Sequence, residues 1–181
     1  MELIKNLKEV SLAKNLFLAI LGTILLAVSA KIKIPFWPVP MTMQTFVVMF
    51  LGILYGWRLG LFTISLYLLE GIVGLPVFAG TPEKGMGLVY FTGPTMGYLI
   101  GFLATVFLTG FFTFNNNFFK NFIKLIFSVS FIYLFGLFWL GLIIGWDKPV
   151  FELGAQPFLL AELFKILILS VLIPKILKFR V

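Results

Sequence analysis

Long apolar runs alternate along the chain with short polar segments and with segments rich in proline or glycine. The runs without a charged residue are 15–30, 34–57, 85–119 and 125–146, whereas 59–82 and 153–174 are apolar but carry charged side chains. A helix that crosses a bilayer needs about 20 consecutive, mostly apolar residues. The pattern predicts six membrane-spanning helices, near residues 13–32, 43–57, 59–75, 94–113, 122–145 and 157–177.

A proline-rich segment, residues 35–40, separates the first two predicted helices. It must interrupt a helix, because proline lacks the backbone N–H and restricts the residue before it. The first apolar run is too long for a cleavable signal peptide, and Lys31 and Lys33 follow it without a clear cleavage site. The loops are short, so we expect residues 1–181 to form a single membrane domain.

The six predicted helices place the chain among the all-α integral membrane proteins, and the composition agrees with this class. Hydrophobic residues make up 61% of the 181 residues and charged residues 12%, against about 45–50% and about 25% in soluble domains. The mean hydropathy is +1.10. The chain has no cysteine and no histidine, which excludes disulfides, thiolate metal sites and histidine-dependent hydrolysis. We expect no metal and no cofactor.

The basic residues flank the apolar runs, so the net charge of +7 is interpreted as a signal of membrane topology rather than of nucleic-acid binding. One predicted face carries nine basic residues, Lys5, Lys8, Lys14, Arg58, Lys120, Lys124, Lys175, Lys178 and Arg180. The other carries four, Lys31, Lys33, Lys84 and Lys148, with Glu83, Asp147 and Glu152. Because cytoplasmic loops are enriched in lysine and arginine, both termini are expected in the cytoplasm.

Three charged side chains fall at membrane depth, namely Glu70, Glu162 and Lys165. Such groups are costly in a bilayer and by default indicate a functional site. Glu162 and Lys165 are three residues apart, so they share a helix face and can pair. The pair either fixes helix packing or belongs to a pocket for a polar solute. Glu70 lies either at the membrane interface or near a ligand.

Polar and aromatic side chains gather at the predicted outer ends of the helices, at Trp37, Thr42, Gln44, Thr45, Thr95 and Tyr98. Gln44 offers both a donor and an acceptor, and helix N-termini present N–H groups suited to a carboxylate. Helix capping is the alternative for Thr42 and Thr95, and an aromatic belt at the interface is the alternative for Trp37 and Tyr98.

Ala19, Thr23 and Ala27 lie on one face of the first predicted helix. Small residues at this spacing allow close helix contact, within the chain or with a partner. No nucleotide-binding loop is present, because Met86 follows Gly85 where such a loop requires lysine. Any movement driven by ATP therefore needs a partner protein.

Three stretches, 38–45 (PVPMTMQT), 74–80 (GLPVFAG) and 93–102 (GPTMGYLIGF), resemble the BioY family, the biotin-binding S-components of energy-coupling factor (ECF) transporters. A weaker similarity covers 154–165. The resemblance implies six helices with both termini inside, in the plasma membrane, and capture of biotin at the outer face. It also implies a transmembrane coupling protein and two cytoplasmic ATPases as partners, with Ala19, Thr23 and Ala27 docking the coupling protein.

On this resemblance, the ligand-binding residues are Trp37, Thr42, Gln44, Phe78, Lys84, Thr95, Tyr98, Glu162 and Lys165. Glu162 would accept an N–H of the ureido ring and Gln44 would donate to its carbonyl. Aromatic side chains such as Trp37, Phe36 and Phe78 would wall the rings. The carboxylate of the biotin tail would lie against Lys165, Tyr98, Lys84 or the start of the fourth helix.

The sequence leaves three other functions open. A capture subunit for another vitamin, such as riboflavin or thiamine, would have the same architecture. A membrane-embedded enzyme could use Glu162 and Lys165 as an acid–base pair. An assembly protein would bind no solute.

Overall fold

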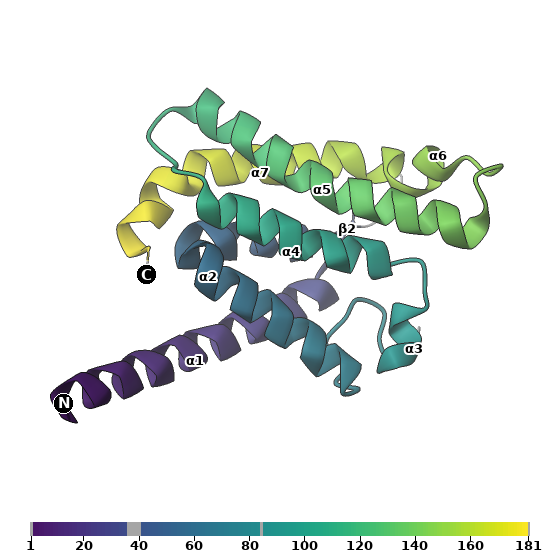
Figure 1. The fold of residues 1–181 in the computed structure, drawn as a ribbon. Helices are drawn as coiled ribbons and strands as arrows, with labels where there is room; N and C mark the ends of the chain where they lie inside the picture. The colour runs from purple at the N-terminus through teal and green to yellow at the C-terminus, as the bar shows by residue number, and fades with distance from the viewer. Residues whose placement is uncertain (1, 36–40, 84, 181) are drawn as a thin grey trace.

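The computed structural model describes residues 2–35, 41–83 and 85–180, with side chains from Leu12 onward (Figure 1). The helices are α1 (Glu2–Lys31), α2 (Gln44–Ile72), α3 (Leu88–Phe91), α4 (Met96–Phe111), α5 (Phe118–Ile144), α6 (Val150–Gly154), α7 (Gln156–Ile176) and the 3₁₀ helix η1 (Leu177–Phe179). The strands are β1 (Lys33–Ile34) and β2 (Met41–Thr42), which pair antiparallel. The helical class predicted from the sequence is confirmed.

Within the described residues, four segments are long and apolar enough to cross a membrane: Leu12–Lys31, Gln44–Ile72, Phe118–Ile144 and Gln156–Phe179. The apolar helix α4 is shorter than the predicted span 94–113. At about 1.5 Å per residue its 16 residues extend about 24 Å. Helix α1 begins well before the predicted start at residue 13, so its polar N-terminal part extends the helix beyond the apolar run.

Helix α2 is folded back on itself at Gly56. This glycine has a φ of 72° and a ψ of 173° inside the helix, a conformation that side chains other than that of glycine strongly disfavour. A straight helix would hold Gln44 and Tyr67 about 35 Å apart, yet Gln44 Nε2 donates a hydrogen bond of 2.8 Å to Tyr67 Oη. The segments 44–55 and 57–72 are therefore two antiparallel halves of a helical hairpin.

Glycine sets the contact of α4 with α5. A side chain at Gly101 would begin 2.5 Å from the Cα atom of Ile132, and one at Gly97 would begin 2.3 Å from the carbonyl oxygen of Phe135. The backbones of the two helices touch only because these glycines have no Cβ atom, as is typical of helix contacts in membranes. This close approach fixes one side of the space between α4, α5 and α7.

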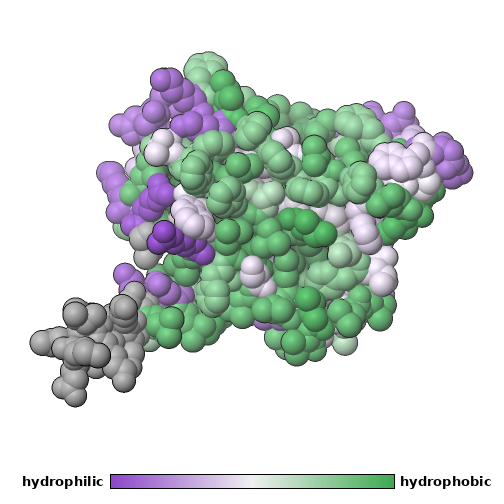
Figure 2. Space-filling model, viewed as in Figure 1, coloured by the Kyte–Doolittle hydropathy of each residue, from purple (hydrophilic) through white to green (hydrophobic). Residues whose placement is uncertain are grey.

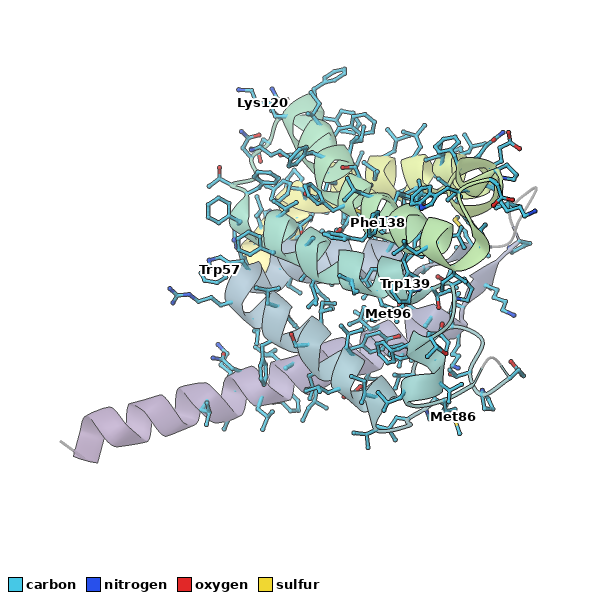
Figure 3. The ribbon with its side chains drawn as sticks, turned by 45° about the vertical axis from the view of Figure 1, so that its right-hand side comes forward. Trp57, Met86, Met96, Lys120, Phe138 and Trp139 are labelled. Carbon is cyan, nitrogen blue, oxygen red and sulfur yellow. The ribbon has the colours of Figure 1, made fainter. Side chains whose placement is uncertain are left out.

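Large apolar side chains are exposed along the helices, including those of Phe62, Phe119, Phe138 and Val171. Figure 2 shows hydrophobic side chains across the middle of one face and hydrophilic ones toward its two ends. Trp57 and Lys120 lie at one end of the molecule and Met86 at the other (Figure 3). Exposed apolar surface of this extent indicates contact with lipid.

The face of α1 that was expected to dock a partner is covered by α2. Ala19 and Thr23 are 0% and 2% exposed, and Ala27 is partly buried. A side chain at Gly22, on the same face, would collide with Thr63 of α2 at 2.5 Å. These small residues therefore serve the contact of α1 with α2 in this structure, and docking of a coupling protein on them stays a prediction.

Candidate functional site

A cavity of about 620 Å³ lies at the end of the molecule where β2, α3 and α6 are found (Figure 1). Its walls come from β2, from the start of α2, from the helices α4, α5, α6 and α7, and from the loop that precedes α3. Most lining residues are apolar or aromatic, with a few convergent polar groups. This size and composition are those of a small-molecule site.

The charged centre of the cavity is an ion pair on one turn of α7. Glu162 and Lys165 are each 4% exposed, and Lys165 Nζ lies 3.2 Å from Glu162 Oε2. Thr45 of α2 donates to the same carboxylate oxygen at 2.9 Å and accepts from Lys165 at 2.8 Å. Charges buried this deeply persist only when they are paired and hydrogen-bonded, and these two are.

The carboxylate of Glu162 is only half satisfied. Its Oε2 atom accepts hydrogen bonds from Lys165, from Thr45 and, at 3.4 Å, from the hydroxyl of Tyr133 on α5. Its Oε1 atom is buried and has no hydrogen-bond partner in the described part of the chain. A buried acceptor without a donor carries the full cost of its desolvation. The carboxylate therefore keeps one acceptor that no donor among the described residues uses.

Gln44 is oriented by a chain of hydrogen bonds. The hydroxyl of Tyr67, which is fully buried, donates its one proton to the carbonyl of Val77 at 2.8 Å. It must therefore accept from Gln44, whose Nε2 atom lies 2.8 Å away. The amide of Gln44 cannot flip without losing this bond. Among the described residues, its carbonyl oxygen and its second N–H have no partner, and Gln44 lines the cavity.

Tyrosine hydroxyls tie the walls of the cavity together. Tyr98 Oη donates to the carbonyl of Gly154 at 2.8 Å, and Tyr90 Oη donates to that of Ala79 at 2.9 Å. Burial raises the pKa of the Tyr90 hydroxyl, so it remains a donor at neutral pH. The ring of Tyr98 fits against α5 because Gly136 leaves room, since a Cβ atom there would lie 2.4 Å from the ring.

Six of the predicted site residues line this cavity: Thr42, Gln44, Thr95, Tyr98, Glu162 and Lys165. Trp37 and Lys84, like Phe36, lie outside the described residues. Phe78 does not line it. Its side chain is 1% exposed and packs edge-on against Tyr67, so the residue predicted as a wall for the ligand belongs to the core behind that wall. Glu70, left open between two roles, does not line the cavity either.

Tyr133 and Tyr90 were missed as lining residues, and Thr45 was noted only for its place at the start of a helix. Tyr133 is the single tyrosine in the apolar run 125–146. A tyrosine hydroxyl within an apolar run needs a hydrogen-bond partner when it is buried, and this was the signal that could have found it. The sequence could not single out Thr45 among its neighbours. Its role, hydrogen bonding to Glu162 and Lys165, depends on how close α2 lies to α7.

The family model for "BioY family" matches residues 4–180. The "Probable biotin transporter BioY" of Pyrococcus horikoshii is 34% identical over 153 residues, which cover 84% of this chain and 90% of the relative. The "Biotin transporter BioY" of Thermotoga maritima is 31% identical over 169 residues, 93% and 98% of the two chains. The crystal structure of an S-component for biotin from an ECF-type ABC transporter superposes with a TM-score of 0.75 and 28% identity, covering 93% of each chain.

Removing the cation alone should destabilise the ligand-free protein more than removing both charges. In the Lys165→Met variant the carboxylate stays buried without its counter-ion, at a cost of about 3–5 kcal/mol. The double variant Glu162→Gln/Lys165→Met has no orphaned charge and should regain much of that stability. Thermal unfolding in detergent micelles measures both. Equal midpoints for the single and double variants would contradict the buried ion pair.

Proposed function

Because this chain belongs to the BioY family, we propose that its polar cavity is the site at which it captures biotin at the outer face of the membrane. The protein is a biotin-binding subunit of an ECF transporter, a multi-pass protein of the plasma membrane and not an enzyme. Its partners are the ECF module, for which we propose one transmembrane coupling protein and two cytoplasmic ATPases. That module supplies the energy, since Met86 stands where a nucleotide-binding loop needs lysine.

The observation that carries the proposal is the unpartnered, buried oxygen Oε1 of Glu162. The ureido ring of biotin presents two N–H groups and a carbonyl. One N–H would donate to Oε1 and complete the hydrogen bonds of the carboxylate. The second N–H of Gln44 would donate to the ureido carbonyl, since its first is held by Tyr67. Recognition of this kind rejects analogues that lack the N–H groups, because the polar atoms of the site would then remain unpaired.

The tail carboxylate of biotin is best matched by the start of α4. The ammonium of Lys165 is committed to Glu162 and Thr45, and the hydroxyl of Tyr98 donates its proton to Gly154. The first N–H groups of a helix have no partner within the helix and attract anions. Thr95, which precedes α4, lines the cavity, so the start of this helix lies at the cavity wall.

We further propose six membrane spans with both termini in the cytoplasm, formed by α1, the two halves of α2, α4, α5 and α7. Seven basic residues with described side chains support one end as cytoplasmic: Lys14, Arg58, Lys120, Lys124, Lys175, Lys178 and Arg180. This end also holds both chain termini and the loop between α4 and α5 (Figure 1). Cytoplasmic loops carry such an excess of lysine and arginine.

The Glu162→Gln variant should bind biotin at least tenfold more weakly, a loss of about 1.4 kcal/mol or more, because the amide offers a weaker acceptor than the carboxylate. Calorimetry in detergent, with riboflavin and thiamine as competing vitamins, measures this. Glu70→Gln is the matched control, because Glu70 lies on α2 and does not line the cavity. Unchanged affinity in folded Glu162→Gln would remove this carboxylate from the site, and binding of riboflavin or thiamine instead of biotin would overturn the choice of ligand.

Single cysteines can test the topology, because the chain has none of its own. Asp147 lies in the loop between α5 and α6 and Asn116 in the loop between α4 and α5, and both are exposed. A membrane-impermeant maleimide should label Asp147→Cys in intact cells and Asn116→Cys only after permeabilisation. The reverse pattern would place the termini outside, and labelling of both variants in intact cells would contradict six spans.

A further inference from the structure

Lys31, the last residue of α1, reaches a distant loop. Its ammonium donates to the carbonyl of Phe78 at 2.9 Å, to the carbonyl of Thr81 at 2.8 Å and to the hydroxyl of Thr81 at 2.8 Å. An ammonium has three N–H donors, and all three are used here. The partners lie 47 and 50 residues further along the chain. Hydrogen bonds from an ionised donor are roughly twice as strong as neutral ones.

The loop that Lys31 holds, residues 77–81, forms part of the cavity wall. We call it the wall loop. Ala79 lines the cavity beside Tyr90, whose hydroxyl donates to the Ala79 carbonyl at 2.9 Å. At the other end of the loop, Tyr67 donates to the Val77 carbonyl at 2.8 Å and accepts from Gln44. Three elements therefore fix this loop by side-chain donors: α1, α2 and α3.

The partners of Lys31 are buried and have acceptor atoms free to receive its N–H groups. Thr81 is buried at 7% exposure, and its hydroxyl gives its proton to the Phe78 carbonyl at 2.8 Å, which leaves its oxygen to accept from Lys31. The lysine also ends its helix, where a cation is favourable for the exposed carbonyls. Loss of the ammonium would leave the turn at 78–81 without its shared donor.

We infer that Lys31 is a positioning residue for the ligand: it holds the wall loop against the cavity and thereby slows the release of bound biotin. The identity of the ligand rests on the proposed function, but the order of the loop does not. Because α1 otherwise packs along α2, a shift of the end of α1 away from α2 would break all three bonds at once. By linkage, bound ligand would in turn hold α1 in place.

The test compares Lys31→Met with Lys33→Met. Lys33 is an exposed lysine two residues away in β1, and its side chain makes no hydrogen bond to the wall loop. In ligand-free Lys31→Met, hydrogen–deuterium exchange of peptides covering 76–83 should be faster than in the unaltered protein. The rate of biotin dissociation should rise about tenfold or more, with a smaller change in the association rate. Lys33→Met should change neither, and Lys31→Arg, which keeps the charge and several donors, should retain most of the slow release.

Exchange measured without ligand tests whether Lys31 orders the wall loop, whether or not biotin binds. Unchanged exchange over 76–83 in Lys31→Met would overturn the inference. Faster exchange with an unchanged dissociation rate would show that the loop does not control release and would also overturn it. Failure of the unaltered protein to bind biotin would contradict the proposed function alone.

Discussion

The ion pair of Glu162 and Lys165 is the constraint on which the site depends. A carboxylate and an ammonium at membrane depth must find partners within the protein. The pair meets this demand by drawing a threonine from α2 and a tyrosine from α5 toward α7. The contact between these helices thus includes buried hydrogen bonds to a charged pair. One carboxylate oxygen has no partner among the described residues, and we propose that a ligand N–H group binds there.

The rest of the fold brings other groups into range of this pair. The reversal of α2 at Gly56 places its first turn beside its second half, so that Gln44 meets Tyr67. Tyr67 then connects the amide in the cavity to the loop that walls it. The glycines of α4 let α5 approach closely, and Tyr133 of α5 donates to the Glu162 carboxylate on α7. Each polar group at the site belongs to a helix or loop whose position is set by packing contacts outside the site.

Much of this could be predicted from the sequence, because hydropathy fixes where helices can cross and burial of charge is rare enough to be informative. Glu162 and Lys165 were identified from that rarity alone, and their spacing predicted the pair. What the sequence could not show was which neighbour covers a given face. Ala19 and Thr23 have the pattern of a docking face and are buried by α2. Phe78 is an aromatic residue of the kind that lines ligand sites, yet it is buried in the core and does not line the cavity. The sequence does not separate these two places, since aromatic residues pack well in both.

The most direct measurement of the central claim is the distance from Glu162 Oε1 to the ureido nitrogens in a crystal structure of the protein with biotin bound. One nitrogen is expected within hydrogen-bonding range of this oxygen, at about 2.7–3.2 Å. The tail carboxylate is expected near the start of α4. A ureido ring that lies outside the cavity, or one whose nitrogens bond elsewhere while Oε1 stays unpartnered, would contradict the account.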